Sequence, residues 1–150
     1  MSRIIKKNNI WYFDDYFDYL NKNEKQIPEN TKYFILDHER YLIRGEKTLY
    51  DSYFKSLKYS IGIGKKKDLL SIIFTNAFNT KKYCFEFQNV IEIKLNCDLD
   101  YLKSSYLLIH QFSINKDNSY KYEFIFTDRS KIILKFKNIS IKEEDISNYE

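Results

Sequence analysis

The sequence of 150 residues has little of the residues that cross-link or interrupt a chain, with 2 Cys, 1 Pro, 3 Gly and 1 Trp. Two cysteines are too few for a disulfide-stapled scaffold. Cys84 and Cys97 also lie too far apart to form the C-x-x-C pair that is typical of zinc or redox sites. We therefore expect both to be free, buried thiols.

Long apolar runs and an excess of one charge are also missing. No segment approaches the roughly 20 apolar residues needed to cross a bilayer, and the start of the chain lacks the apolar stretch of a secretory signal. The net charge is +4, with 25 basic and 21 acidic residues mixed along the chain, so no strong field for nucleic acid is expected. We expect a cytoplasmic protein with no membrane partner.

Aromatic residues are abundant, with 14 Tyr and 12 Phe. Aromatic and β-branched residues favour strands. The contents of 43% hydrophobic and 31% charged residues are close to globular averages. At this length we expect one domain, residues 1–150, with a single core.

Residues 10–20, IWYFDDYFDYL, are predicted to form a helix, because a strand would place aspartate on both of its faces. Asn8 or Asn9 could cap this helix, and Pro28 marks the end of the segment that follows it. At about 100° per residue the apolar side chains gather on one stripe and the acids lie opposite. The residues that we expect in the core are Ile10, Phe13, Phe17 and Leu20, with Tyr16 at the edge of the stripe.

From residue 33 onward the hydrophobic period changes to two, which is typical of strands. Short runs at 33–36 and 41–44 are followed by longer segments, of which 49–57 is ambiguous between helix and strand. The other strand candidates are 57–63, 68–74, 83–87, 91–95, 106–114, 120–127 and 131–141, separated by polar turns such as GKKKD, NAFNTKK, NKDNS and TDRS. Residues 98–105, DLDYLKSS, predict a short helix behind Asp98.

Together these patterns predict an α+β, β-rich fold. It would be a mostly antiparallel curled sheet or meander, with an N-terminal helix and the short helix near 98–105. The N-terminal helix would cover a face of the sheet or protect one of its edges. The acidic tail, residues 143–150, is expected to fray.

No group of residues has the pattern of a catalytic or metal site. His38 lies in a polar stretch, and His110 shares a strand face with apolar residues, where a hydrogen-bonded core histidine is the more common case. The stretch SIGIGKKKD adjoins glycines and lysines but lacks the spacing of a phosphate loop. We therefore predict a protein that is not an enzyme and that carries no metal or cofactor.

The aromatic residues and acids of the N-terminal helix leave two interpretations open. Aspartates near a helix start stabilise its dipole and need no further role. Tryptophan and tyrosine beside acids are also common anchors of protein interfaces. The candidate partner-binding residues are Trp11, Tyr12, Asp14, Asp15, Asp18 and Tyr19.

A nucleic-acid surface is the alternative, because KYEF (121–124) and KIILKFK (131–137) combine lysines with aromatic residues. The period of two argues against it. It places Tyr122, Phe124 and Phe126 on the face that needs a core and leaves an outer face of mixed charge. A nucleic-acid-binding accessory or phage defence protein that uses a Lys and Tyr sheet face therefore remains the second hypothesis.

Residues 48–141 resemble small bacterial immunity proteins of polymorphic-toxin systems. The resemblance is carried by LYDSY (49–53), FQNVIEI (87–93) and the ending F-x-D-x-S-x-I-x-L-x-F (126–136), together with the order of the strands. Residues 1–47 take no part in it. The resemblance implies a protein that binds a cognate toxin domain and blocks it without chemistry of its own. The mild positive charge departs from the acidic inhibitors of basic nucleases.

Overall fold

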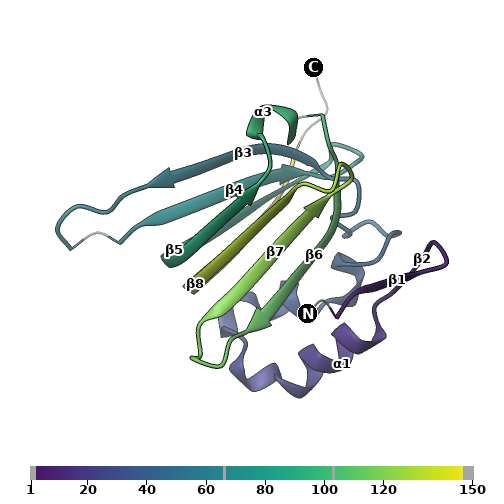
Figure 1. The fold of residues 1–150 in the computed structure, drawn as a ribbon, viewed down its shortest axis with the longest axis horizontal. Helices are drawn as coiled ribbons and strands as arrows, with labels where there is room; N and C mark the ends of the chain where they lie inside the picture. Colours follow the sequence, from purple (N-terminus) through teal and green to yellow (C-terminus); the bar gives the residue numbers. More distant parts are fainter. Residues whose placement is uncertain (1–2, 66, 103, 147–150) are drawn as a thin grey trace.

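The sheet is the main element of the computed structural model, which describes residues 3–65, 67–102 and 104–146. It has six antiparallel strands in the order β3-β4-β5-β8-β7-β6 (Figure 1). The strands are β3 (Tyr53–Ser60), β4 (Leu69–Thr75), β5 (Lys81–Asn96), β6 (Leu107–Ile114), β7 (Tyr120–Phe126) and β8 (Lys131–Asp145). The predicted α+β, β-rich fold is confirmed.

The segment before the sheet forms a hairpin followed by short helices. Its elements are β1 (Ile5–Lys7), β2 (Ile10–Tyr12), α1 (Asp14–Lys22) and α2 (Lys32–Ile35), with 3-10 turns at Glu24–Gln26, Glu29–Thr31 and His38–Arg40. The short helix α3 (Leu99–Leu102) lies within the predicted range 98–105, of which residue 103 is outside the described residues. Asp98 begins it by accepting a hydrogen bond from the Asp100 amide at 2.9 Å.

The sheet folds over on itself. In a flat sheet, β4 and β7 would lie about 14 Å apart, three strand spacings of about 4.8 Å. Instead the rings of Phe74 on β4 and Phe124 on β7 lie 5.4 Å apart. A bridge between Tyr53 and Tyr106 also joins the start of β3 to the start of β6. The curled sheet of the prediction is therefore observed, and its concave side encloses the core.

Two long strands make this folding possible. The first half of β5, to Gln88, pairs with β4, and its second half pairs with β8 alone. Likewise only the first half of β8, to Phe136, pairs with β7. A register shift between Val90 and Glu92 marks the change, and Asn89 has a positive φ of 52°. Sequence patterns predicted two strands at 83–87 and 91–95, which are one bent strand.

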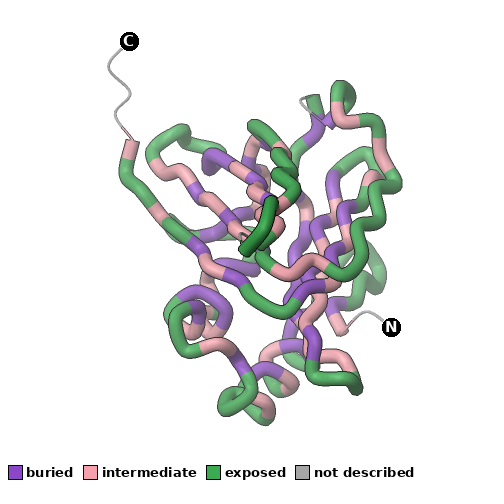
Figure 2. Tube along the Cα trace, turned by 90° about the vertical axis from the view of Figure 1, so that its left-hand side faces the viewer, coloured by how far each residue is buried: buried purple, intermediate pink, exposed green. Residues whose placement is uncertain are grey.

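The core is built largely from phenylalanine and tyrosine. Buried positions alternate with more exposed ones along the strands, as Figure 2 shows. Side chains with no exposed surface include Phe74, Phe85, Phe87, Tyr122, Phe124, Phe126 and Phe136. Rings of 5 to 6 Å separation meet in tilted or edge-on arrangements such as Phe85 against Phe124. The aromatic richness of the composition is thus explained by one packed interior.

The N-terminal helix begins later than predicted. Asn8 and Asn9 both have positive φ, 52° and 62°, and form the two-residue turn of the β1-β2 hairpin, so neither caps a helix. Helix α1 begins at Asp14. Its buried stripe consists of Phe13, Tyr16 and Leu20, with Phe17 half-buried against His38 at 3.9 Å between ring centroids. The core assignment of Ile10 was wrong, since that side chain is 56% exposed on the hairpin.

Three further predictions were wrong. The runs at 33–36 and 41–44 are not strands: the first lies mostly in α2 and the second in a loop. A four-residue apolar run does not distinguish strand from helix by its period, and tertiary packing decided here. The tail does not fray at 143, because β8 continues to Asp145 in register with Lys81. Residues 147–150 lie outside the described residues.

Helix α1 protects the outer edge of β6. The Phe112 amide donates a hydrogen bond to the Tyr16 hydroxyl at 2.7 Å, and the Ile114 amide donates to the Tyr19 hydroxyl at 2.8 Å. These tyrosines are three residues apart on one helix face, and the amides are two residues apart on one strand edge. The expectation that the N-terminal helix protects an edge is confirmed.

The segment after α1 covers a second edge, along the end of β8 that β7 does not reach. Asn30 donates its side-chain amide to the Ile139 carbonyl at 3.2 Å, and Tyr33 donates its hydroxyl to the Ile141 carbonyl at 2.6 Å. Further along the same strand, Glu143 forms an ion pair with the buried Arg40 at 2.9 Å. Side chains from this segment therefore replace the strand that would otherwise pair with β8.

Tyr16→Phe tests the cover of the β6 edge. The ring would keep its packing, but the buried Phe112 amide would lose its acceptor, which costs about 1–3 kcal/mol in a buried site. We expect the free energy of unfolding in urea to fall by this amount. Tyr19→Phe is the matched control, because Tyr19 is half-buried and water can replace its hydroxyl. Equal losses for the two variants would contradict the role given to Tyr16.

Candidate protein-interaction surface

His110 is a structural histidine, as its position among apolar residues predicted. Its Nδ1 lies 2.7 Å from the Tyr122 hydroxyl and its Nε2 lies 2.8 Å from the Arg40 carbonyl. The ring also stacks on Tyr41 with 4.6 Å between centroids. Burial lowers the pKa of His110 to about 4. Both ring nitrogens are engaged within the core, so this side chain is not placed to act on a substrate.

The other candidate chemical groups are scattered. His38 is exposed and stacked on Phe17. Cys84 and Cys97 are free, as predicted, but half-buried rather than buried, and burial raises the pKa of both thiols. Across residues 3–65, 67–102 and 104–146, no three His, Cys, Asp or Glu side chains come close enough to hold a metal ion. The described surface instead presents exposed apolar and acidic side chains that suit contact with another protein.

The structure divides the six candidate partner-binding residues. Tyr12 is 48% exposed, and the three aspartates, Asp14, Asp15 and Asp18, are exposed on α1. Trp11 is half-buried with the Lys6 ammonium 5.3 Å from its ring. Tyr19 has a structural role instead, because its hydroxyl holds the Ile114 amide and the Arg3 guanidinium covers its ring at 3.6 Å.

The β1-β2 hairpin presents exposed apolar side chains that the sequence reading missed. Its register pairs Ile5 with Tyr12 and Lys7 with Ile10, so these four share one face. Ile5, Tyr12, Asp14 and Asp15 line one hollow together with Lys7. We call Ile5, Ile10, Tyr12, Asp14 and Asp15 the hairpin surface. Its sequence signal was the Asn-Asn turn between two short alternating runs.

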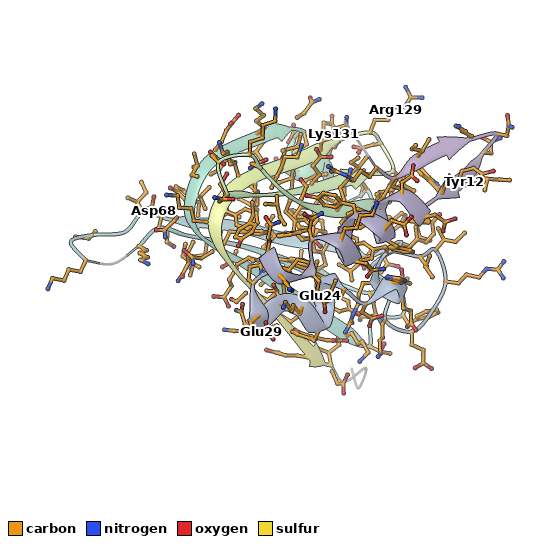
Figure 3. All side chains as sticks on the ribbon, turned by 90° about the horizontal axis from the view of Figure 1, so that it is seen from below. Tyr12, Glu24, Glu29, Asp68, Arg129 and Lys131 are labelled. Atoms are coloured by element: carbon orange, nitrogen blue, oxygen red, sulfur yellow. The ribbon has the colours of Figure 1, made fainter. Side chains whose placement is uncertain are left out.

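A loop beside the hairpin enlarges the apolar area. Leu42 and Ile43 are 37% and 49% exposed, and they line a groove together with Ile10, Trp11 and Phe13. The hairpin projects from one end of the molecule, with Tyr12 on it, whereas Asp68 marks the turn between β3 and β4 at the other end (Figure 3). A projecting strand pair that adjoins an apolar groove has the form of a docking surface.

Acidic and basic side chains occupy different elements here, the acids on α1 and the lysines on β1. Within the described part of the chain, Asp14, Asp15 and Asp18 form no ion pair, so their carboxylates are available to an external cation. Lys6 and Lys7 lie on the hairpin itself, beside the turn. A partner that fits this arrangement would present a basic group toward α1 and an apolar area toward the hairpin.

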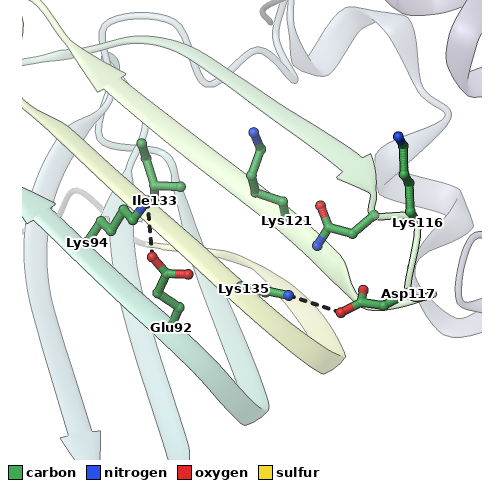
Figure 4. A pocket seen from close by; sticks show the side chains of 8 residues that line it. Glu92, Lys94, Lys116, Asp117, Lys121, Ile133 and Lys135 are labelled. Carbon is green, nitrogen blue, oxygen red and sulfur yellow. Dashed lines mark ion pairs between the residues drawn. The ribbon is translucent and has the colours of Figure 1, made fainter.

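The second hypothesis requires exposed tyrosines on the Lys-rich outer face of the sheet. Tyr122 is fully buried, so this tyrosine does not stack with bases there. A shallow hollow across β5, β8 and β7 is lined by four lysines (Figure 4). Three of them form ion pairs, and Lys116 forms none with the other described residues. The ion pairs are Lys94 with Glu92 at 3.1 Å, Lys121 with Glu123 at 3.0 Å and Lys135 with Asp117 at 3.0 Å. A nucleic-acid partner would find few unpaired charges and no stacking platform on this hollow.

No known protein family, no curated protein and no solved structure matches this chain. The resemblance of residues 48–141 to immunity proteins therefore remains a prediction from the sequence. Among the helices of the described residues, none has the length and apolar character to span a membrane.

The buried neutral state of His110 predicts a loss of stability in acid. Its pKa lies near 4 in the folded protein and near 6.5 when exposed, so protonation favours the unfolded chain. The free energy of unfolding should be highest above about pH 6.5 and should fall by about 3 kcal/mol as the pH drops toward 4. Urea unfolding at a series of pH values measures this slope.

His110→Gln is the control for this slope, because its side chain does not titrate. The variant should lose the slope between about pH 6.5 and 4.5, whatever its absolute stability. Glu143 contributes only at lower pH: burial opposes its charge, but the Arg40 and Lys81 charges hold its pKa below the usual 4.5. An unchanged slope in His110→Gln would show that another group is responsible.

Proposed function

We propose that this chain is a non-enzymatic inhibitor of the immunity type, which binds a toxin domain through the hairpin surface and blocks it. The observation that carries the proposal is the cluster of exposed apolar side chains on a projecting hairpin, next to three aspartates that form no ion pair with the other described residues. The proposal also rests on the resemblance of residues 48–141 to immunity proteins, and it places the inhibitor in the cytoplasm.

The first support is the exposure of the apolar side chains. Ile10, Tyr12 and Ile43 are 56%, 48% and 49% exposed, and Ile5 and Leu42 are each 37% exposed. Contact with a partner would remove this area from water, at about 25 cal/mol for each Å² of apolar surface. Scattered exposed residues need no explanation, but a group gathered on the hairpin and on the loop beside it is typical of interaction sites.

The second support is the anchoring of the hairpin. An isolated hairpin with strands of three residues would be marginal in water. Here Ile4 before it and Phe13 after it are buried, with 4% and 9% exposure, and Trp11 packs against the core. The exposed side chains are therefore held in place before any partner arrives, which lowers the entropy lost on binding.

The third support is the charge of α1. The exposed Asp14, Asp15 and Asp18 can complement a basic site on a toxin and raise the rate of encounter. A positive net charge, here +4, is unusual for an inhibitor of a basic target. The local acidity of α1 offsets it at the proposed contact. Specificity would then come from the aspartates and affinity from the apolar anchors.

Substitutions on the hairpin surface test the proposal against any purified product of an adjacent gene that binds the unaltered chain. Tyr12→Ala should weaken binding by at least about tenfold, as expected for a central aromatic anchor. The triple change Asp14→Asn, Asp15→Asn and Asp18→Asn should slow association, most strongly at low salt, and leave the fold intact. Calorimetry and association kinetics measure the two effects.

Ile61→Ser is the matched control, because Ile61 is 75% exposed but lies in the connection between β3 and β4. Figure 3 shows Asp68 of this connection at the end of the molecule opposite Tyr12. It should leave affinity unchanged. The proposal fails if Tyr12→Ala binds as tightly as the unaltered chain, or if no neighbouring gene product binds. Salt-dependent binding of oligonucleotides instead would favour the second hypothesis.

A further inference from the structure

Two edges of the folded-over sheet have no cover among the described residues. Side chains of the N-terminal segment cover β6 and the second half of β8. The other two edges are β3 and the second half of β5, residues 89–96, which pairs only with β8 because the pairing with β4 ends at Gln88. Beyond that point the β3-β4 hairpin extends away from β5 (Figure 1).

The two uncovered edges differ in character. Strand β3 carries exposed Lys55 and Lys58, charges of one sign that would repel those of a second copy and discourage strand addition. The second half of β5 instead exposes Ile91, Ile93 and Leu95 at 49%, 36% and 43%. An apolar open edge of this kind is a template for another strand.

The sequence of this edge, Ile91-Glu92-Ile93-Lys94-Leu95, is complementary to itself. In an antiparallel pair centred on Ile93, each Ile91 faces the Leu95 of the other copy and each Glu92 faces the Lys94 of the other copy. Centring the pair on Glu92 or on Lys94 would oppose like charges instead. One register is therefore favoured by both charge and apolar contact.

We propose that a second copy of this chain adds to this edge, so that two molecules form a symmetric dimer through residues 91–95 of β5. The contact is isologous, because the same strand serves both copies about a two-fold axis at Ile93. It would join the β5-β8-β7-β6 halves of two molecules into one continuous sheet and would cover Ile91, Ile93 and Leu95 of each copy. No residue of the hairpin surface takes part.

The charged pair makes the register testable. Glu92 and Lys94 are exposed, with 48% and 65% of their side-chain surface accessible and 3.1 Å between them, so single changes should leave the fold intact. Glu92→Lys would place lysines opposite lysines in a dimer, and Lys94→Glu would place glutamates opposite glutamates. Neither variant should dimerise by itself.

Mixing the two variants should restore the dimer, because the two lysines of one copy then face the two glutamates of the other. The double variant Glu92→Lys with Lys94→Glu should also dimerise, since each unlike pair is reformed with its signs exchanged. Sedimentation equilibrium over a wide concentration range measures the association of the unaltered chain, the two single variants, their mixture and the double variant. Circular dichroism confirms that each variant is folded.

If the unaltered chain stays monomeric over the whole concentration range, the proposal is overturned. The edge would then be open to a strand of another protein. Equal dimerisation of the single variants, or no gain on mixing them, would overturn this register. Tyr12→Ala should leave the dimer unchanged, so failure of the toxin-binding proposal and failure of the dimer proposal are distinguishable.

Discussion

The structure depends on how the edges of one curled sheet are satisfied. An exposed edge leaves backbone amides and carbonyls without partners, and each buried group that stays unpaired is costly. Here the N-terminal segment serves two edges with side chains rather than strands. Two tyrosine hydroxyls accept from β6, while Asn30 and Tyr33 donate to β8. The helices are therefore fixed in place by the sheet, and the sheet is completed by the helices.

The same segment carries the charged and titratable groups that hold it to the core. Arg40 is 4% exposed, pairs with Glu143 and lies 4.8 Å above the ring of Phe34. Its carbonyl accepts a hydrogen bond from Nε2 of His110, so one residue contacts both the end of β8 and the middle of β6. Because the segment is held at several points, the hairpin that precedes it projects from a fixed base, which a docking surface requires.

Prediction from the sequence succeeded where the signal is local. The alternation in 120–126 correctly assigned the buried face of β7, and Asp98 correctly marked the short helix. It failed where two local signals compete. The run from Ile10 to Tyr12 fits a helical stripe and a strand equally well, and the two preceding asparagines can cap a helix or form a turn. In the structure the two asparagines form the hairpin turn, and Ile10 lies on the hairpin surface instead of in the core.

For the candidate site, the sequence by itself determined the residue types: aspartates and aromatic residues close together, and no cluster with a catalytic spacing. Only the tertiary structure decided which of them are free, because hydrogen bonds between distant residues remove some from the surface. Tyr19 is engaged by an amide 95 positions away, whereas Tyr12, seven residues earlier, remains exposed. Local periodicity assigns a residue to a face, but the partner on that face comes from contacts between segments far apart in the chain.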